Sequence, residues 1–195
     1  MDNLLNVKFF NQPEINKREI LRYSGCEKDD ENISKLIDET LDESLDKLTY
    51  SICWRRFPVK RNGDSIDLGF TKVKSKSLEI NLRECNEIIL FAATVGFEID
   101  RLIKRYSKLS PSKSLILQAI GAERVESLCD VFCNELSDKF DCRPRFSPGY
   151  GDLPLSMQKD VISALDCTRK IGIVLNENLL MSPSKSVTAI VGIKS

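Results

Sequence analysis

The chain has 195 residues, 42% of them hydrophobic and 30% charged, which is the composition of a globular protein and not of a disordered one. Lys plus Arg and Asp plus Glu number 29 each, so no net charge draws the chain to nucleic acid or to anionic lipid. The sequence contains no histidine, which excludes histidine-activated nucleophiles, histidine metal ligands and imidazole acid–base catalysis.

The sequence carries no pattern of export or membrane insertion. Its N-terminus lacks a charged start followed by an apolar run, and no apolar stretch is long enough to span a bilayer. The seven cysteines form no C-x-x-C pair, so neither a zinc knuckle nor a thioredoxin-type dithiol is indicated. We therefore expect a cytoplasmic protein with small buried thiols, no metal site, and no membrane or nucleic-acid partner.

The first fifty residues are predicted to form helices. Residues 12–25 read as a short helix with Pro13 in its first turn and Gly25 at its end. A second helix is expected over residues 33–48, where apolar residues recur at helical spacing and acidic residues face the other way. We expect residues 1–50 to form a helical segment that packs on a body of residues 51–195, the two making one continuous domain.

The central residues predict strands and a long helix. Residues 50–59 and 64–70 are typical of two strands joined by a turn, and residues 87–95 of a buried strand followed by a helix over 97–106. Ser110 and Pro111 are a cap and a first helical residue, and the helical pattern continues to about Phe140. Glu126 and Asp130 lie four residues apart along one line of this helix.

The last third of the chain predicts a proline- and glycine-rich loop, a helix over 154–166, and strands over 170–175 and 186–193. The strands do not alternate regularly with helices, which favours an α+β fold over a doubly wound sheet. We expect a mixed, mainly antiparallel twisted sheet, with the long helix and several shorter helices packed on it.

The loop "RFSPGYGD", residues 145–152, is the strongest candidate for a binding site. Pro148 fixes one backbone angle and Gly149 accepts a positive φ, which are the requirements of a type II turn. Arg145 offers a planar set of donors suited to a carboxylate, and Tyr150 offers a flat face with a polar tip. On these residues alone, a ligand-binding loop and an ordered structural turn remain equally open.

Three stretches of the chain resemble a known family. "RFSPGYGDLPLSMQ" at 145–158, "NENLLMSPSKSVTAIVGI" at 176–193 and "IILFAATVGFEIDRLI" at 88–103 resemble the reactivation domain of cobalamin-dependent methionine synthase. The similarity is strongest to free-standing versions of that domain and extends from Ile15 to Ile193. It implies a domain that binds S-adenosylmethionine and docks over the cobalamin domain of the synthase, where the oxidised cobalt is reduced and remethylated.

The resemblance also implies roles for individual residues. Arg145 matches the family arginine that contacts the carboxylate of S-adenosylmethionine, and Glu126 matches a glutamate near the ligand's charged end. Ser147 and Gly149 fall in the loop whose backbone approaches the ligand, and Tyr150 matches a tyrosine at the mouth of the site. No residue is implied as an acid, base or nucleophile, so the chain would act as one component of a methyltransferase. Cobalamin would be carried by the partner synthase, with a flavodoxin-type protein as electron donor.

Two departures from the family keep other functions open. Where the family has L-T-E-S, this chain has Leu-Asn-Glu-Asn at 175–178, and the family's aromatic contacts beyond the final strand have no counterpart before Ser195. One alternative is a docking module for a corrinoid protein that no longer binds S-adenosylmethionine. Another is a methyltransferase that uses the same ligand on a different substrate.

Overall fold

The computed structural model of the protein describes residues 4–26 and 30–194. Its strands are β1 (Asn6–Phe10), β2 (Tyr50–Pro58), β3 (Lys60–Asn62), β4 (Ser65–Asp67), β5 (Lys72–Val73), β6 (Cys85–Thr94), β7 (Val174–Leu175), β8 (Met181–Ser182) and β9 (Ser186–Lys194). Its α-helices are α1 (Lys17–Tyr23), α2 (Glu31–Ser44), α3 (Lys76–Asn81), α4 (Glu98–Leu109), α5 (Pro111–Ser137), α6 (Gln158–Ala164) and α7 (Cys167–Ile171). Two short 3₁₀ helices are η1 (Leu45–Lys47) and η2 (Leu155–Met157).

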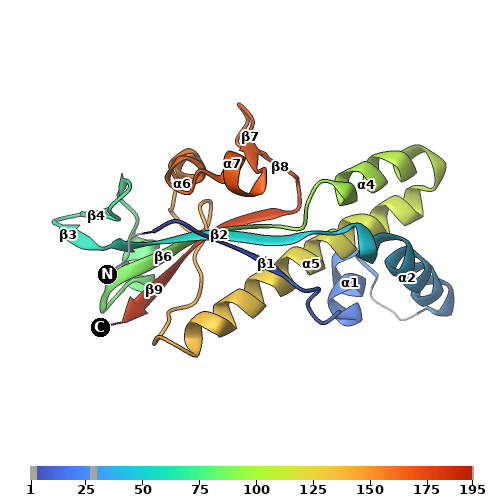
Figure 1. Ribbon diagram of the computed structural model, residues 1–195, viewed down its shortest axis with the longest axis horizontal. Coiled ribbons are helices and arrows are strands. Elements are labelled where there is room, and N and C mark those ends of the chain that lie inside the picture. Colours follow the sequence, from blue (N-terminus) through green and yellow to red (C-terminus); the bar gives the residue numbers. More distant parts are fainter. Residues whose placement is uncertain (1–3, 27–29, 195) are drawn as a thin grey trace.

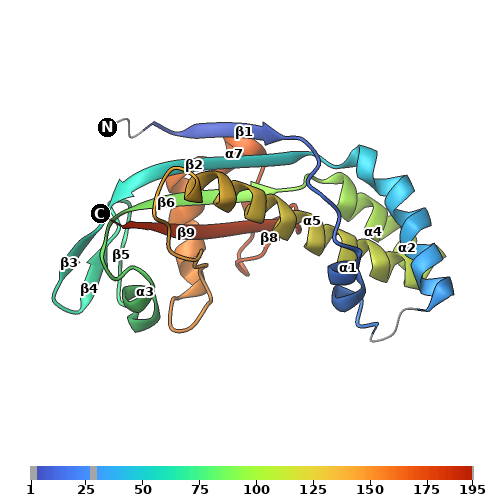
Figure 2. The ribbon, with the colours of Figure 1, turned by 90° about the horizontal axis from the view of Figure 1, so that it is seen from below.

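The main sheet has the strand order β1-β2-β6-β9, and every neighbouring pair is antiparallel. Figure 2 shows the four strands side by side, with β1 and β9 at the two edges. The central strand β6 is apolar along nearly its whole length because both of its faces are covered. The antiparallel sheet with helices on its faces confirms the predicted α+β fold.

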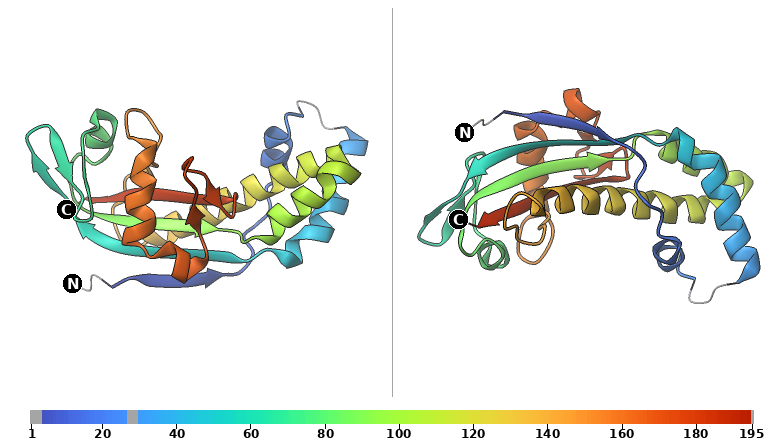
Figure 3. Two further views of the ribbon diagram at one scale, coloured as in Figure 1. Left: turned by 90° about the horizontal axis from the view of Figure 1, so that it is seen from above. Right: turned by 60° about the horizontal axis from the view of Figure 1, so that its bottom comes forward.

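The two faces of the sheet carry different layers. The long helix α5 covers one face, and its apolar side packs with alternate residues of β6 and β9, such as Phe91, Ala189 and Val191. The other face is covered by α6 and α7, whose Val161 and Cys167 pack with Ile190 and its neighbours. Figures 1 and 3 show these layers, with α5 on one side of the strands and α6 crossing them on the other.

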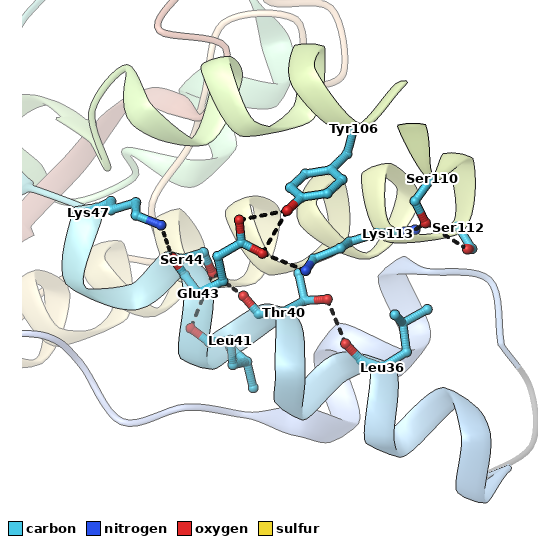
Figure 4. A network of polar contacts seen from close by, with 10 residues as sticks. All are labelled: Leu36, Thr40, Leu41, Glu43, Ser44, Lys47, Tyr106, Ser110, Ser112 and Lys113. Atoms are coloured by element: carbon cyan, nitrogen blue, oxygen red, sulfur yellow. Dashed lines mark hydrogen bonds and ion pairs between the residues drawn. The ribbon is translucent and has the colours of Figure 1, made fainter. Parts of the chain in front are cut away.

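A helical bundle extends beyond one end of the sheet. Ile20 of α1 and Ile37 and Leu41 of α2 pack on the N-terminal half of α5. Figure 4 shows a polar network that joins this bundle, in which Glu43 of α2 accepts hydrogen bonds from Tyr106 of α4 and Lys113 of α5. The hydrogen bonds from Lys113 and then Tyr106 lower the pKa of the Glu43 carboxyl.

The N-terminal prediction was wrong in two respects. Residues 6–10 form a strand that pairs with β2, so the segment over residues 1–50 is not purely helical. Helix α1 begins at Lys17 after Asn16, whose side chain accepts a hydrogen bond from the amide of Glu19, and not at Pro13. The cause is Arg124, which bonds the carbonyl oxygens of residues 13 and 14 and holds that backbone outside the helix.

Two strand predictions were also corrected. The turn after Asn62 joins the short strands β3 and β4 to each other, while β2 pairs with β1 and β6 in the main sheet. Residues 170–175 are mostly not strand, because α7 runs to Ile171 and Gly172 ends it with a φ of +73°. Only Val174–Leu175 pairs, with Met181–Ser182.

Candidate functional site

The predicted loop lies along the open edge of β9. Phe146 exchanges both backbone hydrogen bonds with Ile190, at 2.8 Å each, which fixes the chain before the loop to the sheet. The amide of Tyr150 then donates to the carbonyl of Ser147 at 3.1 Å, and Gly149 between them has a φ of +92°. This hydrogen bond and this φ agree with the predicted type II turn, which requires a residue that tolerates positive φ.

A cavity of about 380 Å³ opens beside this turn. Four of the five residues predicted as a site line it: Glu126 from α5, and Arg145, Ser147 and Tyr150 from the loop. Gly149 does not line the cavity. Its positive φ allows the backbone to form the turn. Tyr150 is 62% exposed and meets the ring of Phe146 edge-on, with 6.3 Å between ring centroids. The structure therefore brings together residues that lie up to 24 positions apart in the sequence.

Arg145 is the charged centre of the cavity. Its Nη2 donates to Glu126 at 2.6 Å, and its Nη1 donates to Asp130 at 2.5 Å. Burial would lower the pKa of Arg145, but the hydrogen bond to Asp130 and the neighbouring negative charges raise it above its ordinary value. The cluster holds one cation and two carboxylates, so it carries a net charge of −1.

The thiols near Arg145 are not poised as nucleophiles. Burial raises the pKa of Cys129 well above its ordinary value and also raises that of Cys133. Both therefore stay protonated at neutral pH, in agreement with the prediction of structural thiols. All seven cysteines are free, and no cluster of metal-binding side chains occurs within residues 4–26 and 30–194. The cavity offers charged and hydrogen-bonding side chains.

Sequence reasoning did not assign six of the ten lining residues to the site. The remaining residues are Pro148, Gln158, Met181, Ser186, Val187 and Thr188. Gln158 Oε1 and Thr188 Oγ1 are buried without a hydrogen-bond partner among the described residues. An unsatisfied buried polar atom costs about 1–3 kcal/mol. Both residues lie in stretches that resemble the family, Gln158 in 145–158 and Thr188 in 176–193. Neither was singled out, because the burial of its side chain depends on the whole fold.

The fold is of the α+β class, and the cavity lies at one edge of its sheet. Solved structures that match the chain include the crystal structure of the MetH reactivation domain bound to AdoHcy, with a TM-score of 0.66 over 84% of this chain at 17% sequence identity. The chain spans 65% of that chain, slightly under two thirds. At this identity the likeness establishes the fold alone.

Two comparisons of the sequence with known proteins found no match. No family model matches the sequence, and no curated protein matches it. Across the described parts of the chain, no helix combines the length and the apolar character needed to cross a membrane.

Proposed function

We propose that the chain binds S-adenosylmethionine in the cavity beside the loop and acts as a stand-alone reactivation subunit. Its partner would be a cobalamin-dependent methionine synthase whose cobalt has become oxidised, with a flavodoxin-type protein as electron donor. S-adenosylmethionine supplies the methyl group, and the cobalamin belongs to the partner. The observation that carries the proposal is the meeting of Glu126, Arg145, Ser147 and Tyr150 around one cavity of about 380 Å³.

The likeness of the fold supports the proposal. The matching domain, named as the MetH reactivation domain, was solved bound to AdoHcy, the demethylated form of this ligand. The likeness covers 84% of the chain.

The charges of the cavity fit the amino-acid head of such a ligand. Its carboxylate could pair with Arg145 and its ammonium with Glu126. The two new ion pairs would replace the Arg145–Glu126 ion pair, so no charge would be left unpaired. Asp130 would keep its own hydrogen bond to Arg145 and so hold the guanidinium in place. With its sulfonium, S-adenosylmethionine carries a net charge of +1, which complements the −1 of the cluster.

Unsatisfied polar atoms give a second test of fit. The amide oxygen of Gln158 and the hydroxyl of Thr188 lack hydrogen-bond partners among the described residues, and both residues line the cavity. A ligand with an uncharged, hydrogen-bonding part beyond its charged head would satisfy them. The residues present therefore fit a compound that is ionic at one end and polar but neutral at the other.

Isothermal titration calorimetry with S-adenosylmethionine tests the proposal. We expect Arg145→Ala to weaken binding roughly 10- to 150-fold, because each charge-assisted hydrogen bond contributes about 1.5–3 kcal/mol. Arg143→Ala is the matched control: Arg143 lies in the same segment, pairs with Glu84, and does not line the cavity. Absence of heat with the wild-type chain, both alone and with the cobalamin domain of a synthase present, would contradict the proposal.

One observation favours a second candidate function. Both terminal nitrogens of Arg145 already bond carboxylates of the chain itself, as expected if Arg145 had become a structural residue. The chain would then be a docking module for a corrinoid protein that does not use S-adenosylmethionine. In that case Arg145→Ala should leave partner binding intact and change no reactivation rate, whereas a working ligand site predicts a slower reactivation.

A further inference from the structure

We propose that the chain binds a small aromatic anion in a second cavity, between the C-terminal half of α5 and strands β1, β2 and β6. This cavity has a volume of about 430 Å³ and shares no lining residue with the cavity beside the Ser147–Tyr150 turn. Sites for small molecules typically have volumes of about 300–1,000 Å³. The inference goes beyond the binding of S-adenosylmethionine and does not rest on it.

The cavity is built from one face of the sheet and one side of the long helix. The sheet contributes Asn6, Lys8, Trp54, Arg56 and Ile89. Within β1 and β2 these residues are two positions apart, so they point to the same face of the sheet. The chain at the end of α5 contributes Phe132, Glu135, Leu136, Lys139 and Phe140. The first three of these are three or four positions apart, which places them on one side of α5.

Aromatic rings form one part of the lining. The ring centroids of Trp54 and Phe132 lie 5.3 Å apart, with the rings tilted by 54°. Phe132 is buried, whereas Trp54 and Phe140 are only partly buried where they pack on the core. The two partly buried rings leave aromatic surface in the cavity that a flat ligand can cover.

Cations with unused binding capacity form the other part. Arg56 Nη2 donates to Glu87 at 2.5 Å, but Arg56 Nε is buried without a hydrogen-bond partner in residues 4–26 and 30–194. Lys8 pairs with Glu135 at 2.6 Å, whereas the exposed Lys139 has no ion-pair partner among the described residues. Three cations against two carboxylates leave this cluster with a net charge of +1.

The rings and the cations together define the class of ligand. The guanidinium carbon of Arg56 lies 5.1 Å from the centroid of the Phe140 ring, so positive charge and aromatic surface adjoin in the cavity. An aromatic ring that bears a carboxylate would cover the rings and place its charge beside Arg56 and Lys139. The net charge disfavours a cation such as S-adenosylmethionine here, and a neutral ring would leave the cations unused.

Nuclear magnetic resonance on the full chain tests the inference. Trp54 is the only tryptophan of the sequence, so its indole N–H gives a single assigned signal that reports on this cavity. The probes are naphthoate, naphthalenemethanol and naphthylmethylammonium, which share one ring system and differ in charge. We expect naphthoate to shift the Trp54 signal and to bind at least about tenfold more tightly than the alcohol, the value of one charge-assisted hydrogen bond. The ammonium compound should bind more weakly than the alcohol.

Substitutions test which cations hold the acid group. Lys139→Ala should weaken naphthoate binding about two- to fivefold, as expected for an exposed ion pair, and leave the alcohol unchanged. Lys108→Ala is the matched control, because Lys108 is an exposed lysine in the last turn of α4 and does not line the cavity. Arg56→Met should remove most of the remaining preference for naphthoate. Both lysines are exposed, so neither alanine variant should change the melting temperature.

Three results would overturn the inference. The first is equal affinity for naphthoate and the alcohol, and the second is equal naphthoate affinity in Lys139→Ala and Lys108→Ala. The third is an unchanged Trp54 signal at saturating naphthoate. Saturating S-adenosylhomocysteine should leave the naphthoate affinity unchanged, because the two cavities share no lining residue. Competition between the two compounds would place naphthoate in the other cavity, which contradicts this inference and leaves the proposed function standing.

Discussion

The buried ion pair between Glu123 and Arg124 yields a sharp stability prediction. Arg124 is fully buried and donates to the carbonyls of Pro13 at 2.7 Å and Glu14 at 2.6 Å, besides its pair with Glu123. Glu123 in turn accepts the amide of Asn16 at 3.0 Å. The pair therefore ties the segment before α1 to the middle of α5. Replacing Arg124 by Met keeps an unbranched apolar stem but leaves the carboxylate of Glu123 buried and unpaired.

We expect Arg124→Met to lower the free energy of unfolding by about 3–5 kcal/mol, the cost of breaking a buried ion pair on one side. Urea unfolding measures this loss. Arg169→Met is the control, because the Arg169 side chain is 84% exposed and solvent screens its ion pair with Asp166. The double variant with Glu123→Gln should be more stable than Arg124→Met alone. Equal, small losses for Arg124→Met and Arg169→Met would refute the reasoning.

Two further predictions concern the loop and the long helix. Hydrogen bonds from the Ser75 hydroxyl and then from two amides at the start of α3 lower the pKa of Asp152. Asp152 therefore stabilises the fold above the pKa of an unfolded aspartate, about 4, and the advantage of wild type over Asp152→Asn in urea unfolding should shrink as the pH falls below that value and stay constant between pH 5 and 7. Ser110 caps α5 by accepting the amide of Lys113, so Ser110→Ala should cost about 1 kcal/mol in the same assay. Ser112, the second residue of α5, is exposed, so Ser112→Ala should lower the free energy of unfolding by less. Equal losses for the two variants would show that Ser110 does not stabilise the protein as a helix cap.

The elements with strong local signals could be predicted from the sequence. Helix α5 begins at Pro111 because Ser110 and Pro111 provide the cap and the first helical residue. Strand β6 could be predicted from its continuous apolar run, which its buried position in the sheet requires. The four-residue spacing of Glu126 and Asp130 placed them on one line, and both contact Arg145.

The elements that depend on distant partners could not be predicted. Strand β1 has an exposed edge and little apolar alternation, and only its pairing with β2 defines it. The start of α1 is set by Arg124, more than a hundred residues later. In the cavity, the turn could be recognised from Pro148 and Gly149. Gln158 and Thr188 stand out only in the folded structure, where their side-chain oxygens are buried with no partner in residues 4–26 and 30–194.

A crystal structure of the chain with S-adenosylhomocysteine at saturating concentration tests the central claim most directly. We predict that the ligand binds in the cavity beside Tyr150, with its carboxylate paired with Arg145 and its ammonium paired with Glu126. Asp130 should still bond Arg145. An empty cavity in which Arg145 remains paired with both Glu126 and Asp130 would contradict the account.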